Sequence, residues 1–155
     1  MIIRSRFSQP LCVDYNITFA DKESVLLAIR SDEKTIHRMI SQETFRQFAL
    51  SLPETDEHPH FENTAFRVKK KIFATLNLAK NLATLKFSLE NQDVFSAISQ
   101  GAIFPVPNKW GHHGWTHIDL STAEWDLCQD AMQCAWCEVA PPKLLAKHPE
   151  LSDER

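Results

Sequence analysis

The sequence predicts an α+β domain in which an antiparallel β-sheet carries helices packed on one face, with an N-terminal extension before it. Three strand-like runs at 65–68, 72–76 and 82–87 follow one another through short connections. A fourth run, 115–120, comes after an intervening helical segment. Short connections favour antiparallel pairing, and amphipathic helices before, between and after the strands would bury their apolar stripes against the resulting sheet.

Length and composition are consistent with one domain and some additional chain. The protein has 155 residues, of which 43% are hydrophobic and 24% charged, values ordinary for a globular domain. Residues 1–38 differ in character from the rest: 13–19 alternates like a strand and 25–36 has helical spacing. We therefore predict an extension over 1–38, either an added strand and helix or a poorly docked segment, then a domain over 39–150 and a short tail over 151–155.

The cysteines and the apolar runs predict a cytoplasmic protein. Three of the four cysteines (Cys128, Cys134 and Cys137) fall in one expected helix, at spacings that suit no disulfide framework, and the fourth is Cys12. Reduced thiols are therefore expected. No apolar run has the length of a secretory signal or a membrane span, so we expect no membrane partner.

The first helix and the strands that follow have recognisable boundaries. Ser41 is placed as an N-cap, and Pro53 ends the apolar helical face of Phe45, Phe48, Ala49 and Leu52, as expected for these residue types. The polar segment 53–60 is interpreted as a loop. The next two strands flank three lysines, which predicts a β-hairpin whose turn is basic.

The second half alternates helices and loops. Ser88 is expected to cap a helix that ends near Gly101 and turns Leu89, Val94, Phe95 and Ile98 inward. After a proline-bearing loop and the fourth strand, Ser121 and Glu124 have capping-box spacing. They would open a last helix, followed by one further turn in 143–149. Its predicted buried residues are Trp125, Leu127, Cys128, Met132, Ala135, Trp136 and Val139.

The basic hairpin is the first candidate site. Arg67 and Lys69–Lys71, called here the basic tip, are joined by Lys86 on a neighbouring strand. Exposed, mobile cations suffice for contacts with nucleic-acid phosphates. The alternative is a solvated turn whose charge discourages edge-to-edge strand pairing. The formal net charge of −3 confines any such site to a local patch.

The loop 108–115 is the second candidate. Its two tryptophans, Trp110 and Trp115, could stack on bases or line a small-ligand pocket, and Lys109, His112 and His113 could extend the basic surface. The alternative for Trp115 is a role as a core anchor, whereas Trp110 is left open between the two interpretations.

Metal and catalytic motifs are weak. His58 and His60 form an H-x-H pair, and the CxxC of the last helix lies among apolar neighbours, where cysteines act as small hydrophobes. Structural zinc sites need two well-spaced ligand pairs. The chain has only three glycines and neither a nucleophile elbow nor a phosphate-binding loop. We therefore expect no metal, no cofactor and no enzyme activity; a catalytic role would need His58, or His112 and His113, to meet a carboxylate in one cleft.

Residues 41–142 resemble the MmcQ/YjbR family. The resemblance rests on FRQFALSLPETDEHPHF, AFRVKKKIFATL, LKFS, FPVPNKWGHHGWTHIDL and the last helix. It implies a small α+β domain with helices on one side of an antiparallel sheet, and a DNA-binding function through a double-wing arrangement of hairpins. Residues 1–38 have no counterpart in that pattern.

Two function hypotheses follow. The first is a non-enzymatic DNA-binding domain that contacts phosphates weakly and without sequence preference, through Arg67, Lys69, Lys70, Lys71 and Lys86, with Lys109, His112 and His113 beside them. About four neutralised phosphates would give a slope near −3.6 for log K against log salt. The second is an adaptor that binds a protein or a small molecule through Trp110 and Trp115.

Overall fold

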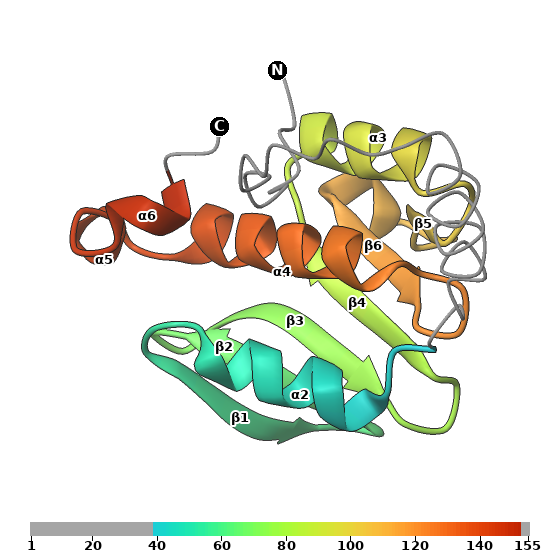
Figure 1. Cartoon of the computed structure of the whole chain (residues 1–155), viewed down its shortest axis with the longest axis horizontal. Helices are drawn as coiled ribbons and strands as arrows, with labels where there is room; N and C mark the ends of the chain where they lie inside the picture. The colour runs from blue at the N-terminus through green and yellow to red at the C-terminus, as the bar shows by residue number, and fades with distance from the viewer. Residues whose placement is uncertain (1–38, 153–155) are drawn as a thin grey trace, which may run out of the picture. The chain divides into compact units, whose positions relative to one another are not determined.

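The computed structural model describes residues 39–152. The strand and helix predicted within 1–38 lie outside the described residues. The described chain forms a six-stranded antiparallel sheet with helices on one face, as predicted (Figure 1). Within the described part, no helix is long and apolar enough to cross a bilayer.

The sheet has the strand order β1-β2-β3-β4-β6-β5, with every neighbouring pair antiparallel. The strands are β1 (Thr55–His60), β2 (Asn63–Val68), β3 (Lys71–Asn77), β4 (Leu82–Lys86), β5 (Ile103–Pro105) and β6 (Trp115–Asp119). The helices are α2 (Gln42–Ser51), α3 (Leu89–Ile98), the 3₁₀ turn η1 (Gly111–His113), α4 (Trp125–Val139), α5 (Pro142–Leu145) and α6 (Pro149–Ser152).

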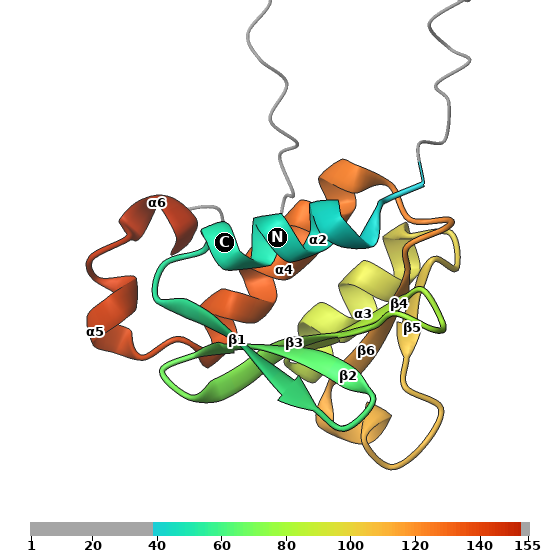
Figure 2. The ribbon, with the colours of Figure 1, turned by 90° about the horizontal axis from the view of Figure 1, so that it is seen from below.

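Helix α2 forms as its sequence predicts. The Ser41 hydroxyl accepts a hydrogen bond from the backbone N–H of Thr44 at 2.9 Å, which satisfies one of the unpaired donors at the helix start. Phe45 and Ala49 are buried on its sheet-facing side. Figure 2 shows α2 and α4 lying together on one side of β1–β3.

Strand β1 corrects the prediction of a loop over 53–60. Its side chains are polar on both faces, so the segment lacks the apolar alternation that marks a strand. It nevertheless pairs along β2, from Thr55 opposite Val68 to His60 opposite Asn63. Pro59 is tolerated because β1 is an edge strand. The short strand β5 was likewise not predicted, because it lies at the start of the segment that was interpreted as a proline-bearing loop.

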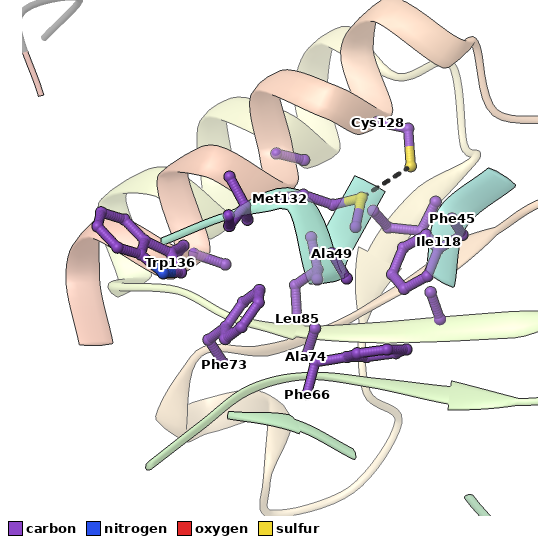
Figure 3. Close-up of a cluster of buried hydrophobic side chains, with 14 of the residues drawn as sticks. Phe45, Ala49, Phe66, Phe73, Ala74, Leu85, Ile118, Cys128, Met132 and Trp136 are labelled. Atoms are coloured by element: carbon purple, nitrogen blue, oxygen red, sulfur yellow. Dashed lines mark hydrogen bonds between the residues drawn. The ribbon is translucent and has the colours of Figure 1, made fainter. Parts of the chain in front are cut away.

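The core lies between the helices and one face of the sheet. Phe66, Leu85 and Ile118 from the strands meet Met132 and Trp136 from α4 (Figure 3). Burying large apolar side chains of this kind contributes about 1.5–3 kcal/mol each. The predicted inward residues of α4 are confirmed for Cys128, Met132, Ala135 and Trp136, while Trp125, Leu127 and Val139 are half-buried against the core.

Two helix details differ from prediction. In α3 the buried positions are Gln92 and Phe95, whereas Leu89 and Ile98 are exposed. Helix α4 begins one residue after Glu124, whose side chain caps nothing. No capping box forms, because the Ser121 hydroxyl bonds to the Asp119 carboxylate instead.

Candidate functional site

The basic tip sits on the two-residue turn between β2 and β3. Its two central residues, Lys69 and Lys70, have φ of 49° and 69°. Such positive values at both positions suit Asn-Gly rather than lysine. A side chain with a Cβ in this left-handed conformation costs about 1 kcal/mol or more per residue. The turn therefore keeps two lysines where the backbone would favour other residues.

Carboxylates at the start of β1 neutralise half of the basic tip. Arg67 Nε and Nη2 donate to the two carboxylate oxygens of Asp56 at 2.8 and 3.1 Å. Lys69 pairs with Glu54. These partners hold the pKa of both carboxyl groups below their usual values, through side-chain hydrogen bonds first and then charge attraction. Both carboxylates are therefore ionised at neutral pH, which leaves the tip less positive than its sequence indicates.

The remaining cations are Lys70 and Lys71. Both are exposed, and neither forms an ion pair within residues 39–152. Lys147 and His148, between α5 and α6, lie close enough to lower the pKa of Glu54 as well. Sequence reasoning missed these two residues because they are distant along the chain, and only the packing of α5 brings them near the tip.

Lys86 and Trp115 pair across β4 and β6 on the face of the sheet opposite the core. Both are half-buried, and the Lys86 ammonium donates to the backbone carbonyl of Phe87 at 2.9 Å. Trp115 is therefore not the core anchor considered above; Trp136 takes that place. Lys86 is also less available to phosphates than a lysine on the tip.

The loop before β6 presents Trp110, whose side chain is 53% exposed. Lys109 Nζ lies 5.8 Å from the centre of the indole ring, and the His113 ring lies 6.4 Å from it. His112 is also exposed. The strand registers place this loop and the basic tip at the same end of the sheet, with β4 between β3 and β6.

Two glycines hold this loop tightly against its neighbours. A Cβ on Gly111 would lie 2.2 Å from the carbonyl oxygen of Val106. A Cβ on Gly114 would lie 1.8 Å from the carbonyl oxygen of Phe87, and Gly114 has φ of 84°. Any side chain at these positions would force the backbone apart, since such contacts are far shorter than van der Waals distance.

A hollow of about 430 Å³ lies between α3 and this loop. Its volume is within the usual range of small-ligand sites. Trp110 does not line it. The lining residues are Leu89, Gln92, Pro105, Val106, Pro107, Asn108, Gly111 and His112.

Glu138 of α4 closes the N-terminus of α3. Its carboxylate accepts from the backbone N–H of Ser88, from the Ser88 hydroxyl at 3.0 Å and from the side-chain amide of Asn91. A helix N-terminus attracts anions through its unpaired N–H groups and dipole. Here the protein's own carboxylate fills that role.

The histidines do not converge. His58 lies on β1 at one edge of the sheet, whereas His112 and His113 precede β6 toward the other edge. Among residues 39–152, no three metal-ligating side chains come together. The CxxC of Cys134 and Cys137 lies inside α4.

Comparison with known proteins finds one matching family model and one solved structure with a similar fold. The YjbR family model matches residues 50–138, more than half of the chain. The crystal structure of the Deinococcus radiodurans protein DR2400, which has a DUF419 domain, superimposes with a TM-score of 0.59. The two are 20% identical over 74% of this chain and 89% of that one, a likeness in fold. No curated protein matches at a significant level.

Proposed function

The chain belongs to the YjbR family, and membership of this family implies a DNA-binding wing. We propose that the protein is a non-enzymatic cytoplasmic protein that contacts nucleic-acid phosphates through the β2–β3 hairpin. The observation that supports this most is the pair of exposed lysines, Lys70 and Lys71, without acidic partners in the described chain. Phosphate contacts need exposed cations on a projecting element rather than a shaped pocket.

The strained turn supports the same proposal. Lys69 and Lys70 occupy positive-φ positions where Asn-Gly would cost less. Residues kept in costly conformations often mark functional positions, because the strain is tolerated for the sake of the side chain.

The ion pairs of the basic tip limit the expected affinity for nucleic acid. Four cations form the basic tip, and two of them, Arg67 and Lys69, already pair with carboxylates. Lys70 and Lys71 would therefore neutralise about two phosphates, which gives a slope near −1.8 for log K against log salt. This is half the slope expected from the sequence. Binding should be weak, salt-sensitive and independent of base sequence.

Fluorescence anisotropy of a labelled random duplex, at low and moderate salt, tests the proposal. Lys70→Glu should weaken binding and make the salt slope shallower by about one. Lys80→Glu is the matched control, because Lys80 is an exposed turn lysine at the opposite end of the sheet, between β3 and β4. It makes the same change in net charge.

Two outcomes would contradict the proposal. Equal losses for the two variants would show that net charge, rather than the hairpin, governs binding. No binding of the unmodified protein at low salt would remove nucleic acid as a partner.

A second candidate function is an adaptor that binds a small molecule or a protein at the loop around Trp110. The exposure of this indole favours this role, as does the hollow lined by other residues of the same loop. Trp110→Ala separates the two functions: it should leave duplex affinity within about twofold, since a phosphate contact does not need the ring. A loss as large as that of Lys70→Glu would instead place Trp110 in the nucleic-acid interface.

A further inference from the structure

The most informative residue that lines the hollow is Gln92, which has a relative exposure of only 5%. Its amide nitrogen lies 3.2 Å from the backbone carbonyl oxygen of Trp115 and 2.9 Å from the Thr116 hydroxyl. A backbone carbonyl can only accept a hydrogen bond, so the group facing it must be the NH₂. The orientation of the Gln92 amide is therefore fixed by its partners.

Both protons of this amide are used. The Thr116 hydroxyl donates its own proton to the carbonyl oxygen of Gly114 at 3.1 Å, so it accepts from Gln92 through a lone pair. The amide thus gives one proton to Trp115 and the other to Thr116. Within residues 39–152, no group donates to the remaining polar atom, Gln92 Oε1. A buried side chain that lines a hollow thereby keeps one unused acceptor.

Asn108 supplies the complementary group at the rim. Its Oδ1 accepts from the backbone N–H of Trp110 at 2.8 Å. A backbone N–H can only donate, so the amide oxygen is fixed on that side and the NH₂ remains for other partners. The residues that line the hollow thus include one amide with an unused acceptor and one with an unused donor, beside the apolar side chains of Leu89, Val106 and two prolines.

We propose that this hollow binds a small, uncharged, largely apolar molecule with an amide-like group, whose N–H donates to Gln92 Oε1 and whose carbonyl accepts from Asn108. The proposal gives the small-ligand form of the adaptor function a defined site, and it rests on that function. It is independent of the hairpin, because no residue of the basic tip lines the hollow.

An anion does not fit this site. No lysine or arginine lines the hollow, where His112 is the one titratable residue of the lining, and the unused carbonyl oxygen of Gln92 repels negative charge. The nearby N-terminus of α3 could otherwise attract an anion, but the Glu138 carboxylate already occupies it. A neutral donor is the partner that this arrangement leaves.

Three matched probes test the ligand class: benzamide, N,N-dimethylbenzamide and benzoate. In two-dimensional NMR of the full chain, millimolar benzamide should shift the Gln92 side-chain amide and the backbone amides of Leu89 and Gly111. The dimethyl compound has no N–H, so its binding should be about three- to tenfold weaker, the value of one neutral hydrogen bond. Benzoate should be weaker than benzamide because of its charge.

Variants locate the site without disturbing the Gln92 hydrogen bonds. Leu89→Trp should fill the hollow and abolish the shifts, because Leu89 is 54% exposed and lines the cavity. Leu78→Trp is its control at a similarly exposed position, 56%, in the β3–β4 turn. Asn108→Asp keeps the oxygen that Trp110 needs and removes the donor, so benzamide should bind several-fold more weakly.

Each result decides the matter. Loss of binding in Leu89→Trp, retention in Leu78→Trp and preference for the N–H probe would support the proposal. Equal binding of benzamide and its dimethyl analogue would overturn the role of Gln92, and shifts that survive Leu89→Trp would overturn the site. Absence of any shift would overturn the ligand class. Duplex binding is measured separately, so failure here leaves the hairpin proposal standing.

Discussion

The basic tip and the loop before β6 lie at the same end of the sheet but differ in backbone conformation and in charge. The tip places Lys69 and Lys70 in left-handed conformations and leaves charge in solvent. The loop uses Gly114 at φ of 84° and Gly111 in close contact with Val106, and it forms one side of an open hollow that no lysine, arginine or acid lines. One surface suits a polyanion and the other a neutral molecule.

The acids around the two regions sharpen the contrast. Glu54 and Asp56 reduce the charge of the tip by pairing with Lys69 and Arg67. Glu138 instead satisfies the N-terminus of α3. In each region, carboxylates decide how much attraction for an anion remains. Positive charge in the sequence is therefore a poor measure of anion affinity until its partners are known.

The largest expected effect is on the loop. Gly114→Ala should lower the free energy of unfolding by about 3 kcal/mol or more, because the Cβ would meet the Phe87 carbonyl oxygen in a strained conformation. Gly101→Ala is the control, since its φ is 93° but nothing lies within 4 Å of its Cβ position. It should cost only about 1–2 kcal/mol. Urea denaturation measures both, and equal losses would show that φ alone, not the close packing, constrains Gly114.

A smaller loss is expected from Glu138→Gln, which removes the charge that caps α3. The free energy of unfolding should fall by about 1–2 kcal/mol, as for a charge-assisted bond at a helix start. Glu90→Gln, an exposed acid in the first turn of the same helix, should change it by less than about 0.5 kcal/mol. Thermal denaturation at low salt distinguishes them; equal effects would mean that Glu138 acts through the dipole rather than through its hydrogen bonds.

Replacing the central turn residues should make the protein more stable and weaken its binding to duplex DNA. The double variant Lys69→Asn, Lys70→Gly should raise the free energy of unfolding by up to about 1 kcal/mol, because both new residues suit positive φ. The gain is reduced by loss of the exposed Lys69–Glu54 pair. Duplex affinity should fall in the same protein. Unchanged affinity with higher stability would show that the lysines serve no phosphate contact.

The smallest effect concerns His117, which lies on the sheet face opposite the core and meets the Thr84 hydroxyl at 2.8 Å. Burial lowers the pKa of His117 below its ordinary value of 6.5, with a lesser contribution from the charge of Lys80. The unfolded chain therefore binds more protons, so stability should fall slightly as the pH drops below about 6.5 toward the folded pKa.

NMR titration of the His117 ring checks that shift, and His117→Gln should flatten this part of the stability profile. A ring that titrates at or above pH 6.5 would contradict it. A low value would also mean that His117 itself adds no positive charge to this face of the sheet at mildly acidic pH.

Local residue patterns predicted most of the fold. Ser41 and Ser88 marked two helix starts that the structure confirms, because N-capping depends on a few neighbouring atoms. Apolar alternation located β2, β3, β4 and β6 for the same reason. β1 escaped prediction because an edge strand with polar side chains on both faces takes its shape from pairing with β2, which leaves no local signal.

The candidate site was only partly predictable. The lysines of the tip and the tryptophan loop were visible as residue types at suitable positions. Gln92 was not, because a glutamine in a helix gives no sign that it will be buried and that Trp115 and Thr116 will take both its protons.

The sequence by itself determined the α+β class, the Ser41 and Ser88 helix caps, the basic hairpin and the family. Tertiary structure alone decided which charges remain available, since Glu54 and Asp56 reach the tip only through β1 pairing and chain reversal. The tertiary structure also forms the hollow, which exists because α3 packs beside the loop before β6. The physical reason is range: caps and turns depend on adjacent residues, whereas ion pairing and burial depend on atoms far apart in the chain.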